Sequence, residues 1–166
     1  MKQNTRKLTA LALTISFALI LSYIESRIPA FVAIPGIKIG LANIAVIFTL
    51  DKFGAKEAVL ISILRILLVS MMFGSPVSMI YSIAGAVLSL GSMIILKRLT
   101  QLREVAISVV GGVMHNVGQI ATASLMISTN IIIYYLPFLI LSGTIAGIAV
   151  GVASALLIRR INLKTK

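Results

Sequence analysis

Apolar residues occur along this chain in six runs, which are separated by short segments rich in polar or charged residues, glycine or proline. A membrane-spanning helix needs about 20 predominantly apolar residues, within a range of roughly 17–25. The pattern therefore predicts an all-helical integral membrane protein, a bundle of six spanning helices over Leu8–Ile24, Ile34–Leu50, Ala55–Met72, Val77–Leu96, Val105–Ile127 and Ile131–Ile158. Together the runs use most of the 166 residues, which predicts one membrane domain over residues 1–166.

The basic residues predict which side of the membrane each connecting segment faces. Lys and Arg are concentrated in the cytoplasmic segments of membrane proteins. With the N-terminus inside, only Arg27 and Lys38 fall in outer segments, and Arg65 lies within a span. The remaining basic residues fall in inner segments: Lys2, Arg6, Lys7, Lys52, Lys56, Lys97, Arg98, Arg103, Arg159, Arg160, Lys164 and Lys166. Both termini are therefore expected in the cytoplasm.

Composition excludes several other classes of protein. Hydrophobic residues make up 59% of the chain and charged residues 11%, whereas a soluble domain carries roughly a quarter charged residues. The net charge of +11 is scattered between apolar runs rather than gathered on one soluble face, so no nucleic-acid partner is expected. The chain has no Cys and only four acidic residues, which leaves little for catalysis. We expect neither an enzyme nor a cofactor.

Small residues recur at every third or fourth position in three of the runs, and such stripes allow membrane helices to pack closely. Two interpretations are open for each stripe: packing inside the bundle, or docking to another membrane subunit. The first run is the best docking candidate, because a terminal helix can present an outer face. Its small residues form two neighbouring strips, one of Ala10, Thr14 and Ala18 and one of Ala12 and Ser16.

Polar groups inside a span are costly and usually mark a cavity, a partner or a pathway. Arg65 lies near the middle of the third run and needs an acceptor. It can pair with Glu25 at the outer end of the first run, cap backbone carbonyls, or contact an anionic ligand. The segment from Glu25 to Gly36 contains two prolines and is predicted to form the rim of a pocket open to the outside.

The fifth run contains a second group of polar residues. His115, Gln119 and Thr122 share one helical face, and Asn116 lies beside it. A lone histidine without other ligands does not predict a metal site. His115 is expected either to hydrogen-bond between helices or to contact a ligand. Asn43 and Tyr81 could complete such a pocket, although Tyr81 could equally be a packing residue.

Three stretches of this sequence resemble a known family. They are residues 33–43 (AIPGIKIGLAN), residues 65–85, which run from RILLV through FGSPV to YSIAG, and residues 111–119 (GGVMHNVGQ). With Ser22-Tyr-Ile-Glu25, they resemble the Gx transporter family, often labelled heptaprenyl diphosphate synthase component I. That family in turn resembles the substrate-binding S components of energy-coupling factor (ECF) importers, which are multi-pass proteins of the bacterial cell membrane.

The resemblance implies an outward-facing pocket, a coupling subunit docked on the first helix and two ATPases that drive transport. The substrate would be a small anionic or amphipathic molecule such as a flavin, another vitamin, or an isoprenoid or quinone precursor. The expected ligand-binding residues are Arg65, His115, Asn116 and Gln119, with Asn43, Lys38 and Glu25 at the mouth. The alternative is a non-catalytic membrane accessory subunit of a prenyl diphosphate synthase or of a redox complex.

Overall fold

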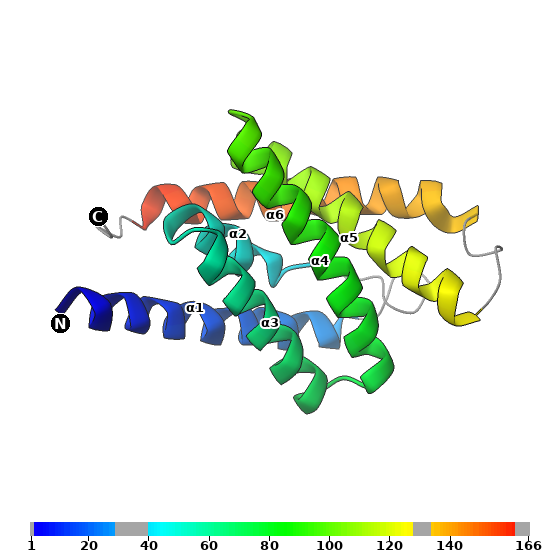
Figure 1. Ribbon diagram of the computed structural model, residues 1–166, viewed down its shortest axis with the longest axis horizontal. Coiled ribbons are helices and arrows are strands. Elements are labelled where there is room, and N and C mark those ends of the chain that lie inside the picture. The colour runs from blue at the N-terminus through cyan, green and yellow to red at the C-terminus, as the bar shows by residue number, and fades with distance from the viewer. Residues whose placement is uncertain (1, 29–39, 128–133, 162–166) are drawn as a thin grey trace.

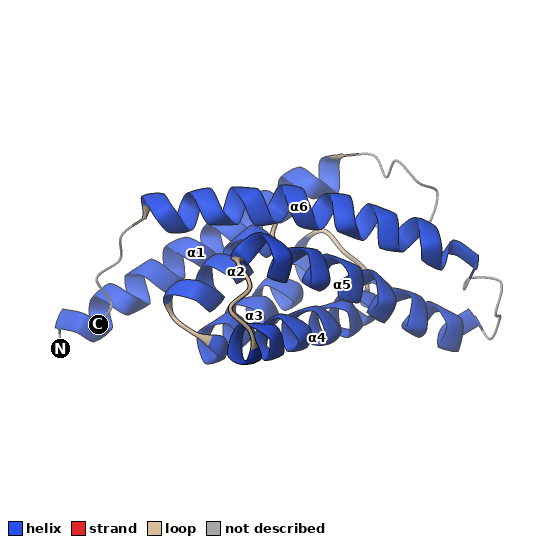
Figure 2. Cartoon of the chain, turned by 90° about the horizontal axis from the view of Figure 1, so that it is seen from above, coloured by secondary structure: helices blue, strands red, loops and turns tan. Residues whose placement is uncertain are grey.

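The computed structural model describes residues 2–28, 40–127 and 134–161. These residues form helices joined by loops, without β-strands (Figure 2). In chain order the helices are α1 (Lys2–Arg27), α2 (Asn43–Lys52), α3 (Ala55–Met72), α4 (Pro76–Leu99), α5 (Glu104–Ile127) and α6 (Leu136–Arg160). The expectation of an all-helical protein is therefore confirmed for the part of the chain that the structure describes.

Four of these helices are long and apolar enough to cross a membrane, judged by length and composition: Asn4–Arg27, Pro76–Leu99, Glu104–Met126 and Leu136–Arg160. Large apolar side chains such as Leu13, Val87 and Leu141 are exposed on three of them, as lipid contact requires. Helix α3 has 18 residues but contains three charged ones, Lys56, Glu57 and Arg65. The structure thus supports a multi-pass membrane protein, with four helices of clear spanning character in the part of the chain that it describes, and the prediction of six spans is not confirmed.

Helix α2 differs most from the sequence prediction. The apolar run at 34–50 was expected to span the membrane, but its helix begins at Asn43 and has 10 residues. At 1.5 Å per residue it is about 15 Å long, half of the ~30 Å hydrocarbon core. Residues 34–39 of that run lie outside the described residues.

The apolar composition of α2 fits its buried position between other helices. Every residue from Ile44 to Leu50 is buried, and α2 contacts α1, α3 and α6. A helix that is hydrophobic all round is a buried helix. Together with side chains from α3 to α6, the buried side chains of α2 form the apolar core of the bundle.

The other helices also pack against one another. Helix α5 packs extensively against both α4 and α6, α3 contacts α4, and α1 contacts α3 (Figures 1 and 2). The first residues of α1, the turn between α2 and α3 and the last residues of α6 lie toward the same end of the molecule (Figure 1). Two ion pairs join helices near that end, Lys7 with Glu57 and Lys97 with Asp51.

Glycines set the close approach of α5 and α6. A Cβ atom added at Gly112 would lie 2.5 Å from the carbonyl oxygen of Gly143, and one at Gly147 would lie 2.6 Å from Val109 Cα. Both distances are shorter than real Cβ contacts. Gly143 and Gly147 belong to the small-residue stripe of the sixth run, so this stripe serves packing within the chain, the first of the two interpretations that the sequence left open.

Helix α1 presents its two small-residue strips in opposite directions. Thr14 and Ala18 are buried and Ala10 is partly buried, so this strip faces the rest of the chain. Ala12 and Ser16 are exposed on the other side. The Thr14 and Ser16 hydroxyls donate hydrogen bonds to backbone carbonyls one turn earlier, which leaves both strips without free donors. Only the Ala12 and Ser16 strip is accessible to a partner.

Candidate functional site

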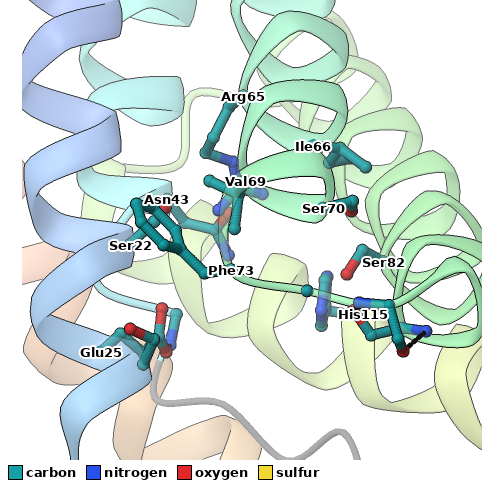
Figure 3. Close-up of a pocket in the computed structure, with 15 residues that line it drawn as sticks. Ser22, Glu25, Asn43, Arg65, Ile66, Val69, Ser70, Phe73, Ser82 and His115 are labelled. Atoms are coloured by element: carbon teal, nitrogen blue, oxygen red, sulfur yellow. Dashed lines mark hydrogen bonds between the residues drawn. The ribbon is translucent and has the colours of Figure 1, made fainter.

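A cavity of about 440 Å³ lies where the ends of α1, α2, α3 and α4 meet the middle of α5. Its lining residues come from all five helices and from the α3–α4 loop (Figure 3). They are Ser22, Glu25, Ser26, Gly40, Asn43, Arg65, Ile66, Val69, Ser70, Phe73, Gly74, Ser75, Ser78, Ser82 and His115. Ten of the fifteen are polar or charged, which is an unusual concentration in a chain that is 59% hydrophobic.

Arg65 is the cationic side chain among the described residues that line this cavity. Its side chain extends from α3 toward Asn43 at the start of α2 (Figure 3). The Arg65 Nε is buried and has no hydrogen-bond partner among the described residues. A buried donor without a partner is costly. The Nε–H of Arg65 can therefore donate a hydrogen bond to an acceptor that enters the cavity.

Glu25 supplies the negative charge on the opposite wall. Its carboxylate accepts a hydrogen bond from the backbone N–H of Gly40, and it attracts the Arg65 guanidinium across the cavity. Gly40 has a φ of 79°, a left-handed conformation that glycine adopts without strain. The bond from Gly40 fixes the start of α2 against the end of α1, and it holds Glu25 on the cavity wall.

His115 closes the cavity from the side of α5. A Cβ atom added at Gly85 of α4 would lie 2.7 Å from His115 Cε1 and 2.8 Å from its Nδ1. The imidazole therefore occupies the space that a side chain at position 85 would need. The His115 ring can lie here because residue 85 is a glycine and has no side chain in this space.

Serine hydroxyls make up the rest of the polar wall. Five of these serines line the cavity although sequence reasoning did not propose them as ligand-binding residues: Ser26, Ser70, Ser75, Ser78 and Ser82. Ser75 also caps α4, because its Oγ accepts a hydrogen bond from the Ser78 backbone N–H at 3.1 Å. Helical spacing could have indicated Ser70, because it places Ser70 on the same side of the helix as three other lining residues, Ile66, Val69 and Phe73.

Of the expected ligand-binding residues, the cavity brings together Arg65, His115, Asn43 and Glu25. Gln119 is buried, but neither Gln119 nor Tyr81 lines this cavity. Lys38 lies outside the described residues.

Asn116 has a different environment from that of His115. Its amide nitrogen donates to the Leu139 carbonyl at 2.7 Å and to Ser142 Oγ at 3.4 Å, both on α6. Neighbouring positions on a helix point about 100° apart, so His115 faces α4 while Asn116 faces α6. In this structure Asn116 joins two helices and does not line the cavity.

The comparison with protein families identifies this chain over most of its length. Residues 14–157 match the family described as heptaprenyl diphosphate synthase component I. The chain belongs to that family. The family resemblance read from the sequence motifs is therefore confirmed, while the further similarity to ECF S components stays a prediction. No curated protein and no solved structure matches the chain.

Proposed function

We propose that this chain is a membrane-embedded substrate-binding subunit, similar in role to an ECF S component. It captures a small molecule in the cavity around Arg65, and a separate coupling subunit with two ATPases supplies the energy for import. The single observation that carries the proposal is the polar cavity inside an otherwise apolar helical bundle.

The size and chemistry of the cavity support a small ligand. A volume of about 440 Å³ lies within the range of roughly 300–1,000 Å³ for small-molecule sites. Ionisable groups inside membrane proteins usually mark a substrate pathway or binding site. Arg65, Glu25 and His115 all line this one cavity, although they come from three different helices.

Arg65 is expected to make the principal charged contact with the ligand. A hydrogen bond between charged groups contributes about 1.5–3 kcal/mol, so Arg65→Ala should weaken binding by about 10- to 150-fold. The measurement is native mass spectrometry of protein extracted in mild detergent from its own membranes, which reports the retained small molecule directly.

The matched control is Lys56→Ala, because Lys56 is an exposed cation on the same helix and does not line the cavity. This variant should retain the ligand as the wild type does. Equal retention by a correctly folded Arg65→Ala protein would refute the role of Arg65.

A second candidate function is favoured by the family match. The family description names a component of heptaprenyl diphosphate synthase, so the chain could be a non-catalytic membrane subunit of such an enzyme. Affinity purification of the tagged chain from its own membranes distinguishes the two functions. Co-purified ATPases and a coupling subunit support the importer, whereas a stoichiometric soluble synthase subunit with an empty cavity supports the accessory role.

A further inference from the structure

We propose that the cavity takes a small polar molecule bearing a single carboxylate, and that it does not take a diphosphate. This inference names the ligand class of the proposed binding subunit and therefore rests on the proposed function. It follows from the charges that line the cavity, from the orientation of the helix ends around it and from the chemistry of its walls.

Among the residues that the structure describes, the side chains on the cavity wall carry almost no net charge. Arg65 contributes one positive charge and Glu25 one negative charge, and with His115 counted as neutral the sum is zero. Arg27 is near in sequence to Glu25, but it is exposed, does not line the cavity, and donates a hydrogen bond to the Tyr23 hydroxyl at 3.0 Å.

The partial charges of the helix ends around the cavity also sum to about zero. The N-termini of α2 and α4 reach it through Asn43 and Ser75, and the C-terminal turns of α1 and α3 reach it through Ser26 and Phe73. An N-terminus acts as roughly half a positive charge and a C-terminus as roughly half a negative charge. Two of each leave the dipole contributions close to cancellation.

A diphosphate would place two or more negative charges in this environment. One of them could pair with Arg65, but the others would lie unpaired beside Glu25, whose carboxylate is held on the wall by the Gly40 N–H. Unpaired charges in a low-dielectric site are strongly unfavourable. A single carboxylate needs one cation, and the planar guanidinium of arginine matches the geometry of a carboxylate well.

The rest of the lining favours a compact ligand rich in hydroxyl or amide groups. Each of the six serine hydroxyls can both donate and accept a hydrogen bond. The apolar part of the wall, as far as the described residues form it, consists of Ile66, Val69 and Phe73. Three apolar side chains offer too little surface for a long isoprenoid chain.

The first test identifies the molecule that the wild-type chain retains from its native membranes. After native mass spectrometry, the released molecule is analysed by accurate mass for phosphorus and by methyl esterification for the number of carboxyl groups. One carboxyl group without phosphorus is the expected result. A retained molecule that contains phosphorus would overturn the ligand class and leave the proposed binding function intact. A wild-type protein that retains nothing would count against the binding function itself.

The second test addresses the charge argument with inorganic diphosphate as the probe. Thermal unfolding of the detergent-solubilised full chain is measured for the wild type, Glu25→Gln and Glu57→Gln. Diphosphate should not stabilise the wild type measurably. Its affinity for Glu25→Gln should be at least tenfold higher than its affinity for the wild type, because the repelling charge is gone. The glutamine side-chain carbonyl can still accept the hydrogen bond from the Gly40 N–H.

Glu57→Gln is the matched control, since Glu57 pairs with Lys7 and does not line the cavity. It should behave as the wild type does. Stabilisation of the wild type by diphosphate, or no gain in Glu25→Gln, would overturn the charge argument.

Discussion

At the scale of single residues, the contact between Gly85 and His115 governs the shape of the cavity. The imidazole lies over Gly85, within 2.9 Å of where a Cβ atom would be. His115 is partly buried, and it lines the cavity from α5. The histidine can hold this place only because position 85 has no side chain, so the two positions form one structural unit.

Gly85→Ala should push the His115 ring out of its present position. Because the ring is the far end of a side chain and can rotate, we expect a modest loss of stability of about 1 kcal/mol, the low end of the range for overpacked sites. Ligand retention should fall by roughly tenfold, an effect of about 1.4 kcal/mol. Thermal unfolding and native mass spectrometry measure the two effects separately.

The control for this prediction is Gly91→Ala on the same helix, where an added Cβ atom meets no heavy atom within 4 Å. It should leave both stability and ligand retention unchanged or slightly improved. Full ligand retention by Gly85→Ala would show that the position of His115 does not matter for binding.

At the scale of helices, the glycines of α5 and α6 determine how closely the two helices pack. An added Cβ atom at Gly147 would lie 2.6 Å from Val109 Cα and 2.9 Å from the Ser108 carbonyl oxygen. These are backbone atoms, which cannot move aside as a flexible side chain can. The α5–α6 contact is therefore much less tolerant of substitution than the contact between Gly85 and His115.

Gly147→Ala should destabilise the protein by about 1–3 kcal/mol, because the helices must separate to admit the methyl group. Thermal unfolding in detergent measures the loss, with Gly91→Ala again as the control that adds a methyl group in open space. Equal unfolding temperatures for the two variants would contradict the close α5–α6 packing.

The exposed strip of α1 carries a prediction about partners. Ala12 and Ser16 face away from the rest of the chain, and small residues allow another membrane helix to approach closely. If the proposed importer function is right, Ala12→Trp should abolish co-purification of the proposed coupling subunit while ligand retention stays at the wild-type level. Leu64→Trp is the control, because Leu64 is an exposed apolar residue on α3. Unchanged co-purification with Ala12→Trp would place the docking surface elsewhere.

At the scale of the whole molecule, the two ends of the bundle differ in chemistry. The cavity lies toward the end formed by the C-terminal turn of α1 and the α3–α4 loop. The ion pairs Lys7–Glu57 and Lys97–Asp51 join helices at the opposite end. If both termini lie in the cytoplasm, as the sequence predicts, the cavity faces outward and the ion pairs lie on the cytoplasmic side.

This orientation can be tested cleanly because the natural chain has no cysteine. A membrane-impermeant thiol reagent added to intact cells should label Tyr134→Cys, whose parent residue is exposed just before α6 begins. Leu102→Cys, in the exposed α4–α5 connection, should be labelled only after the membrane is opened. The reverse pattern would contradict the predicted orientation.

The sequence by itself determined most of the helices of this protein. Their apolar runs are long enough that helix formation follows from the need to satisfy every backbone hydrogen bond in lipid. The ends of α3 were predicted as the structure has them, Ala55–Met72. The sequence also indicated that Arg65, Glu25, Asn43 and His115 belong near one site, because costly polar groups stand out against an apolar background.

Only the tertiary structure decided the role of α2 and the directions of the polar side chains. An apolar run looks the same whether lipid or neighbouring helices cover it, so the buried α2 was read as a spanning helix. Helical periodicity tells which residues share a face, but not which helix that face meets. His115 therefore faces the cavity and Asn116 faces α6 because of how α4 and α6 pack against α5, and this packing depends on contacts between residues far apart in the chain.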